Sequence, residues 1–192
     1  MFDLLFNSIN EKVFLSGEEL QLLKTFFIPK KLRKKQYLLQ EGDVNKFTAF
    51  VEKGVMRSYT IGENGNEHII QFALEGWWIS DNYSFQTGEP SSYTIDALED
   101  AELLLITTSS MEAMLEKIPK MERYFRLLLQ KNIIALQQRL ACTLSQTAEE
   151  KYLSFSNLYP TIIQRVPQHM IASYLGVTPE TLSRIRKQMS VK

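Results

Sequence analysis

The feature that most constrains the fold is a change in the spacing of hydrophobic residues near residue 110. Residues 36–107 contain short runs rich in β-branched and aromatic residues, separated by turn signals such as EGD, EKG and TGEPS. The segment ENGN (63–66) is a strong hairpin signal, because an Asn-Gly step tolerates positive φ at little cost. Several short strands at this spacing predict a sandwich, barrel or jelly-roll rather than a parallel sheet.

A helical pattern follows. Residues 110–144 contain no glycine and one proline, Pro119. Six residues recur at spacings of three and four, which is nearly a heptad repeat: Phe125, Leu129, Ile133, Leu136, Leu140 and Thr143, called the seam here. One interpretation packs this helix on its own sheet. We favour a second, in which the seam pairs with a second copy, because Leu128 and Ala135 offer an adjacent apolar stripe.

Two shorter helices are also predicted. One opens at Ser16, because Ser16 and Glu19 have the spacing of a capping box ahead of apolar residues. The other spans residues 145–159 and ends at Pro160.

The segment VPQHMIASYLGVTPETLSRIRKQM (166–189) predicts two short helices joined by a tight turn. Pro167 suits the first turn of the first helix, and Gly176 suits the tight turn between the two helices. Thr178 is expected to cap the second helix, and Pro179 is expected to be its first residue. On the second helix three apolar residues are expected to face inward: Leu182, Ile185 and Met189. Four polar residues are expected to face outward: Glu180, Ser183, Arg184 and Lys187. This arrangement is typical of a helix-turn-helix whose second helix enters a major groove.

The charge distribution agrees with a nucleic-acid contact at this end. The formal net charge of the 192 residues is zero, but from Pro160 onward there are five basic residues and one acid, Glu180. A locally basic module can meet a polyanion while the rest of the molecule does not. An acid retained in a basic patch suggests that bases are read, since a glutamate can accept from a cytosine amino group.

Other residue patterns mainly exclude functions. No apolar stretch approaches the ~18 residues that cross a bilayer, and the first residues lack a basic leader, so a cytoplasmic protein is expected. The one cysteine, Cys142, allows no internal disulfide and no zinc or iron–sulfur site by itself. We interpret Cys142 as a small hydrophobe, His68 as structural, and KKLRKK (30–35) as a solvated edge. No catalytic cluster is visible, so neither an enzyme nor a cofactor is predicted.

The β-rich region, the long helix and TPETLSRIRK together resemble the family of the cyclic-AMP receptor protein and the oxygen regulator FNR (Crp-Fnr). The resemblance covers essentially the whole chain. It implies an α+β fold with a β-roll effector domain over residues 1–118, a double-stranded jelly-roll of the cyclic-nucleotide-binding type. A dimerisation helix over 119–144 and a winged helix-turn-helix over 145–192 complete the implied organisation.

The resemblance also implies roles for individual residues. A homodimer would bind a pseudo-palindromic DNA site, with Glu180, Ser183 and Arg184 contacting bases. Phosphate contacts are expected from Gln168, His169, Thr178, Thr181 and Lys187. Pro179 stands where the cyclic-AMP receptor has an arginine, so the contact that this arginine makes in that branch is not expected here. RNA polymerase is a further candidate partner.

The loop GWWISDNYSFQTGEPSS (76–92) corresponds to the family's phosphate-binding cassette. Where the family has a ribose-binding Glu after a glycine, Trp77 follows Gly76, and Ser91-Ser92 replaces the phosphate-binding Arg-Ser pair. A buried phosphate needs a cation or convergent N–H donors, and no Arg or Lys occurs between Arg57 and Lys117. We therefore expect no binding of cyclic AMP or cyclic GMP.

Two interpretations of this degenerate pocket stay open: either Trp77 and Trp78 fill the space of the nucleotide, or a less charged effector packs against them. The rival function for the whole chain is a small-molecule sensor or interaction module whose helix-turn-helix contacts protein. Salt distinguishes the two, because DNA affinity falls steeply with ionic strength and an apolar contact changes little.

Overall fold

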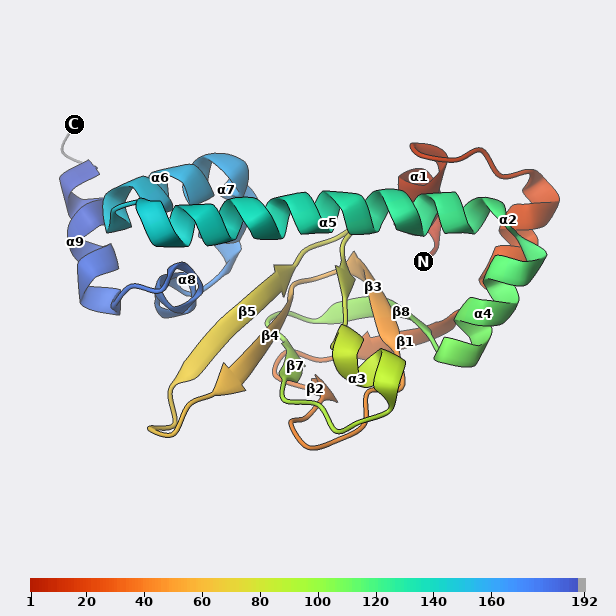
Figure 1. The fold of residues 1–192 in the computed structure, drawn as a ribbon, viewed down its shortest axis with the longest axis horizontal. Coiled ribbons are helices and arrows are strands. Elements are labelled where there is room, and N and C mark those ends of the chain that lie inside the picture. The colour runs from red at the N-terminus through yellow and green to blue at the C-terminus, as the bar shows by residue number, and fades with distance from the viewer. Residues whose placement is uncertain (190–192) are drawn as a thin grey trace. The chain divides into compact units, whose positions relative to one another are not determined.

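The computed structural model describes residues 1–189, and the chain divides into two compact units. The first unit comprises residues 1–60 and 71–130, and the second comprises residues 61–70 and the chain from Lys131 onward. Figure 1 labels most of the helices and strands.

The strands form two four-stranded sheets (Figure 1). In the first sheet the order is β1 (Ile28–Leu32), β8 (Ala101–Ile106), β3 (Thr48–Lys53) and β6 (Trp78–Ile79). In the second sheet the order is β2 (Tyr37–Leu39), β7 (Thr94–Ala97), β4 (Met56–Ile61) and β5 (Glu67–Ala73). Neighbours such as β1 and β8, β3 and β8, and β4 and β7 run antiparallel. The predicted β-roll is confirmed.

The β-region starts earlier than residue 36, where the strand-rich runs begin in the sequence. Strand β1 begins at Ile28, and four of its five residues are exposed, with only Leu32 buried. It therefore lacks the alternation by which a half-buried strand is recognised. Lys30 and Lys31 lie exposed on this strand, as expected for a solvated edge.

Two hydrophobic clusters stabilise the first unit. Ala49 and Val51 of β3 belong to a cluster between the two sheets, whereas Phe50 belongs to a second cluster. Successive residues of a strand point to opposite faces, so β3 is buried on both sides. The second cluster packs the first sheet against α1 (Asp3–Asn10), α2 (Gly17–Lys24), α4 (Thr108–Lys117) and the start of α5 (Lys120–Ser145).

The helix boundaries follow their local signals. Ser16 and Glu19 form the predicted capping box at the start of α2. The helical pattern from residue 110 is two helices, α4 and α5, with Pro119 between them, because the residue before a proline is disfavoured in helical conformation.

The second unit contains most of α5 and four further helices: α6 (Ala148–Leu158), α7 (Pro160–Arg165), α8 (Gln168–Leu175) and α9 (Pro179–Met189). The helix predicted over 145–159 is thus α6, but Pro160 does not end the helical region, since it occupies the first turn of α7. Residues 131–189 contain no strand, so the wing that the resemblance implies is not found among the described residues of this part. None of the helices described is long and apolar enough to span a membrane.

Candidate nucleic-acid interface

The turn between α8 and α9 is fixed by backbone hydrogen bonds. Gly176 adopts φ of 69°, in the left-handed region that glycine enters without strain. Its N–H donates to the Ser173 carbonyl at 3.1 Å, and the Val177 N–H donates to the Ala172 carbonyl at 3.0 Å. Together these bonds form a Schellman motif, which ends α8 and redirects the chain.

Helix α9 begins as predicted. The Thr181 N–H donates to the Thr178 hydroxyl at 3.2 Å, which caps the helix, and Pro179 is its first residue. Pro167, by contrast, lies just before the first turn of α8 rather than within it. Leu182 and Ile185 are buried, and Met189 is half-buried.

The opposite face of α9 is polar and open to solvent. Glu180, Ser183, Arg184 and Lys187 are all exposed, and with Pro179 they line a shallow depression of the surface. Within residues 1–189 the Arg184 guanidinium has no ion-pair or hydrogen-bond partner. The side chain is therefore available to an external acceptor. Lys192, which contributes to the basic charge of the tail, lies outside the described residues.

Glu180 is held as an anion at the start of α9. Its own backbone N–H and then the Thr178 hydroxyl donate to the carboxylate, and these bonds lower the pKa of Glu180 below its ordinary value. An ionised carboxylate only accepts hydrogen bonds. Glu180 can therefore accept a hydrogen bond from the amino group of a DNA base, whereas its negative charge repels a phosphate group.

The remaining predicted DNA contacts lie at two helix starts. Gln168 and His169 are exposed in the first turn of α8. Thr178 is exposed and Thr181 half-buried in the first turn of α9, with 3.1 Å between their hydroxyl oxygens. Unpaired backbone N–H groups and the helix dipole make such ends suitable for phosphate oxygens.

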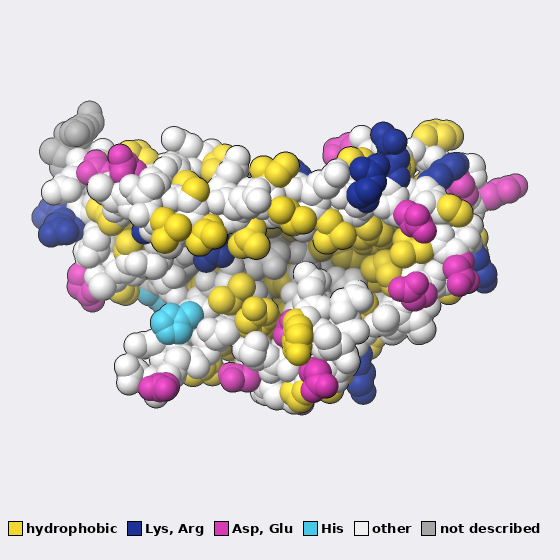
Figure 2. All heavy atoms as spheres, viewed as in Figure 1, with side chains coloured by type: hydrophobic (Ala, Val, Ile, Leu, Met, Phe, Trp, Pro, Cys, Tyr) yellow, Lys and Arg dark blue, Asp and Glu magenta, His cyan; other side chains and the backbone are white. Residues whose placement is uncertain are grey.

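The seam on α5 divides into two parts. Near its start, Met121 and Tyr124 are buried, and Phe125 packs edge-on against Trp78 with 5.4 Å between ring centroids. From Leu129 onward the seam residues Leu129, Ile133, Leu136 and Leu140 are between 56% and 65% exposed. Figure 2 shows hydrophobic side chains in a row along this helix. The first turns of α5 pack into the hydrophobic core, whereas the seam residues from Leu129 to Leu140 are mostly open to solvent.

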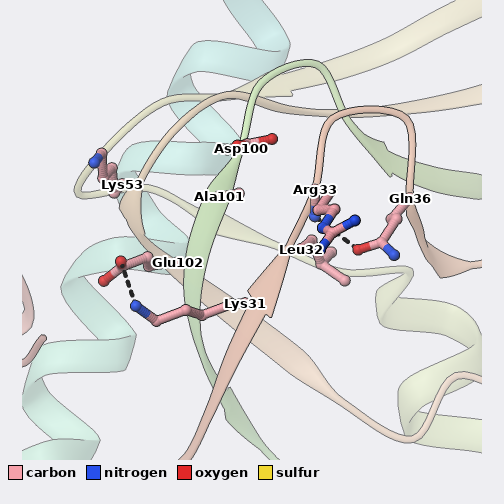
Figure 3. Close-up of a pocket in the computed structure, with 8 residues that line it drawn as sticks. All are labelled: Lys31, Leu32, Arg33, Gln36, Lys53, Asp100, Ala101 and Glu102. Carbon is pink, nitrogen blue, oxygen red and sulfur yellow. Dashed lines mark hydrogen bonds and ion pairs between the residues drawn. The ribbon is translucent and has the colours of Figure 1, made fainter.

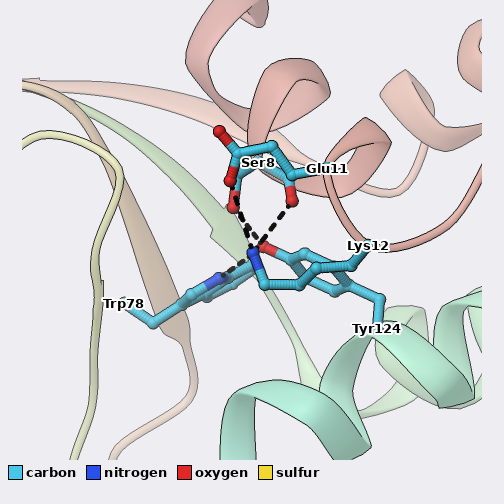
Figure 4. Close-up of polar contacts among 5 residues, drawn as sticks. All are labelled: Ser8, Glu11, Lys12, Trp78 and Tyr124. Atoms are coloured by element: carbon cyan, nitrogen blue, oxygen red, sulfur yellow. Dashed lines mark hydrogen bonds and ion pairs between the residues drawn. The ribbon is translucent and has the colours of Figure 1, made fainter. Parts of the chain in front are cut away.

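The loop 76–92 is more ordered than its sequence suggested, because it contains β6 and a short helix, α3 (Asn82–Thr87). Trp77 packs against the cluster between the sheets, but Trp78 faces the other way. Its ring lies 5.3 Å from Phe50, and its indole N–H donates to the Tyr124 hydroxyl at 3.2 Å (Figure 4). The interpretation in which both tryptophans fill the roll is therefore wrong for Trp78.

The Tyr124 hydroxyl joins three elements (Figure 4). It lies 3.1 Å from the Ser8 hydroxyl of α1 as well as accepting from Trp78 of β6. The Lys12 ammonium lies 5.5 Å from the centre of the tyrosine ring. Burial raises the pKa of Tyr124, so the phenol stays protonated and can donate to Ser8.

A buried carboxylate, Asp81, is hydrogen-bonded to Ser91 of the loop 76–92. The Ser91 hydroxyl donates to Asp81 Oδ2 at 2.6 Å, and both residues are buried, whereas Ser92 is exposed. Asp81 also accepts from the N–H groups of Tyr83 and Ser84 at the start of α3. In the second sheet the guanidinium of Arg57 is already engaged by Asp96 through bonds of 2.8 and 3.0 Å. This environment disfavours a bound phosphate monoanion.

A charged hollow lies beside the paired strands β1 and β8 (Figure 3). It measures about 410 Å³ and is lined by both signs of charge, including Arg33, Lys53 and Asp100. Lys31 and Glu102 form an ion pair of 2.9 Å across it. This pairing agrees with a solvated edge. Across residues 1–189, no group of three or more His, Cys, Asp or Glu side chains could hold a metal ion.

Comparisons with known proteins find a domain model, curated relatives and solved structures that resemble this chain. A family model described as the cyclic nucleotide-binding domain matches residues 29–118. The anaerobic regulatory protein of Haemophilus influenzae is 29% identical over 183 residues, which cover 89% of this chain and 70% of that protein. The fumarate and nitrate reduction regulatory protein of Vibrio cholerae is 28% identical and is covered to 72%. The chain is thus similar to regulatory proteins of this kind over most of its length.

Solved structures support the fold of this chain. FixK2 from Bradyrhizobium japonicum has a TM-score of 0.72 at 21% identity, with 86% of this chain and 85% of that chain covered. The catabolite activator protein of Thermus thermophilus has a TM-score of 0.58 at 19% identity, with coverages of 95% and 86%. The matched domain spans β1 to α4 and ends immediately before α5.

Two features of this chain were not predicted from the sequence. Asp81 was not singled out, although an Asp directly before a short polar segment is a helix N-cap signal. Arg139 and Ser173 were not singled out either, because their hydrogen-bond partners lie about 70 and 104 residues away in the sequence. Only the long-range packing of the second unit brings those groups together.

Proposed function

We propose that this protein is a member of the Crp-Fnr family, a sequence-specific DNA-binding regulator of transcription that acts as a homodimer in the cytoplasm, without enzymatic activity. The observation that carries the proposal is the exposed face of α9, where Glu180, Ser183, Arg184 and Lys187 surround an open depression while Leu182 and Ile185 anchor the helix. The relatives named above are regulatory proteins, in agreement with this function.

The chemistry of the face suits base reading. Arg184 can donate two hydrogen bonds to O6 and N7 of a guanine, and Glu180 can accept from the amino group of a cytosine. The two lie four residues apart on the same side of α9, so they address neighbouring positions of a half-site. Ser183 assists from between them. Gln168, His169, Thr178, Thr181 and Lys187 fix the protein on the phosphate backbone.

A second copy is proposed to cover the seam. The exposed part from Leu129 to Leu140 keeps a near-heptad spacing, and an uninterrupted apolar row of this kind marks an interaction site. Two recognition helices then enter successive major grooves about one helical turn apart. In this organisation residues 1–118 form the effector domain, 119–144 the dimerisation helix and 145–192 the DNA-binding domain, with RNA polymerase as the partner on DNA.

Cyclic nucleotides are not proposed as effectors. The bond between Ser91 and Asp81, and the pairing of Arg57 with Asp96, leave no free cation for a cyclic phosphate in this part of the roll. Trp77 lies against the inter-sheet cluster and supports a roll that is filled by its own side chain.

The test is the selection of random DNA duplexes by the purified protein without added ligand. Enrichment of an inverted repeat with G·C pairs in each half-site is the expected result. Protein that is folded and dimeric but enriches no sequence, with or without cyclic AMP, would contradict the proposal. Enrichment only in the presence of cyclic AMP would contradict the part that concerns the effector.

A further inference from the structure

The hairpin of β4 and β5 contributes residues 61–70 to the second unit. There the edge of β5 that pairs with no other strand contacts α8. Strand β5 is the last strand of its sheet, so the polar groups along its outer edge lack a neighbouring strand. An uncovered strand edge can pair with another chain and cause aggregation, so proteins usually cover it. Here the cover consists of the side chains of Ser173 and Arg139, which with the β5 backbone at residues 67–70 and Tyr174 form what we call the hairpin clasp.

Ser173 takes the place of a partner strand. Its hydroxyl accepts from the Ile69 N–H at 3.0 Å and donates to the Glu67 carbonyl at 2.7 Å. A residue of a neighbouring strand would satisfy the same N–H and C=O, two positions apart on the same edge. One hydroxyl therefore ties α8 to β5 with two hydrogen bonds.

Arg139 of α5 connects a third element to the clasp, in addition to β5 and α8. Its guanidinium donates to the Ile70 carbonyl at 2.6 Å and to the Tyr174 carbonyl at 3.1 Å. It also lies over the Tyr174 ring, 3.9 Å from the ring centre. The Tyr174 carbonyl belongs to the last turn of α8, whose carbonyls have no partner within the helix. A cation at this end also complements the helix dipole.

The clasp holds the helix-turn-helix at its turn. The carbonyls of Ala172 and Ser173 accept from the turn residues Val177 and Gly176, and the Tyr174 carbonyl accepts from Arg139. Thr178, which caps α9, follows four residues after Tyr174. Any movement of this last turn of α8 is therefore passed to the start of α9.

The clasp does not cover the recognition face. Glu180, Ser183 and Arg184 stay exposed while the clasp is closed. A contact that blocked DNA would bury these residues, so the geometry favours support over inhibition. The edge of β5 lies beside α8, on the side of the clasp.

We propose that Arg139 and Ser173 are positioning residues for DNA recognition, which hold α8 on the β4–β5 hairpin and thereby set the orientation of α9. The proposal rests on the proposed function, since it concerns the specificity of the same DNA contact. Neither residue needs to touch DNA. Their loss should lower affinity for the selected site more than affinity for DNA in general.

The experiment compares Arg139→Ala and Ser173→Ala in the full-length protein, on the duplex enriched by selection and on a scrambled duplex of equal length. The matched controls are Arg126→Ala, an exposed arginine on the same helix whose hydrogen bond is to Gln130, and Ser156→Ala, a serine bonded within α6. Arg139→Ala should weaken binding to the selected duplex about tenfold, in the usual range of coupling between two sites. Binding to the scrambled duplex and the salt dependence should stay those of the controls.

Arg139→Lys separates positioning from simple attraction to phosphate. A lysine keeps the charge but cannot donate in the fork geometry of the guanidinium. If Arg139 contacted phosphate, lysine would restore affinity for both duplexes. Positioning predicts that lysine restores binding to the selected duplex only in part.

Hydrogen exchange at the Ile69 N–H gives an independent readout, because that group donates to Ser173. Coupling between two sites is reciprocal, so saturation with the selected duplex should slow exchange at Ile69 in the parent protein. Ser173→Ala should speed it without DNA. The proposal is overturned if the parent binds its duplex while both clasp variants bind it as tightly as the controls. If the parent selects no duplex at all, the proposed function itself fails, and the positioning role fails with it.

Discussion

The exposed seam makes a quantitative prediction about Leu136→Lys. Leu136 is 65% exposed in the single chain, so a lysine there should cost the folded monomer little. Complete burial of a leucine contributes about 1.5–3 kcal/mol. The exposed share of the side chain therefore corresponds to about 1–2 kcal/mol per chain and about 2–4 kcal/mol for a symmetric pair. The Kd of the dimer should rise by about 30–1,000-fold, and more if the ammonium groups meet.

Sedimentation velocity over a range of protein concentrations measures this change, with DNA affinity as the functional readout. The control is Leu158→Lys on α6, which is 68% exposed but lies outside the seam. Both variants should keep the urea midpoint of unfolding that the parent shows when it is monomeric. A Leu136→Lys protein that dimerises as tightly as the Leu158→Lys protein would refute the assignment of the seam to a second copy.

The other predictions concern the recognition helix and the core. Arg184→Ala should relax specificity at one G·C pair and cost about 1–3 kcal/mol in competition binding with altered duplexes. Lys187→Ala should weaken binding to all sequences and reduce the slope of log K against log salt by about 1. Tyr124→Phe leaves the indole N–H of Trp78 without its acceptor and should cost about 1–3 kcal/mol in urea unfolding. The pKa of Glu150 is lowered by hydrogen bonds from the Thr147 N–H and hydroxyl, so its contribution is present above the ordinary pKa and lost as pH falls through the lowered value. Glu150→Gln should flatten this acid dependence in thermal unfolding.

Local signals explain why the helix-turn-helix could be predicted in detail. Gly176, Thr178 and Pro179 each act on the backbone within a few residues of themselves, and the two faces of α9 follow from a helical period. The capping box at Ser16 is local in the same way. Such features need no knowledge of the rest of the fold.

The cassette loop could not be derived in this way. Strand β6 has only two residues, too few for a periodic pattern, so nothing in the sequence tells which way Trp77 and Trp78 point. Strand β1 escaped detection because its lysines face water and its pairing with β8 spans about 70 residues of sequence. The clasp at Ser173 is likewise a long-range contact with no local signal.

The opposite orientations of Trp77 and Trp78 give the protein two separate optical reporters. Trp77 lies against the cluster between the sheets, whereas Trp78 contacts Phe125 one turn before the exposed seam begins. With Trp78→Phe the remaining indole fluorescence follows the interior of the roll and any molecule that enters it. With Trp77→Phe the remaining fluorescence comes from Trp78 and reports on the start of α5, next to the exposed part of the seam. One chain thus carries intrinsic probes for effector entry and for dimer formation, and neither requires an attached dye.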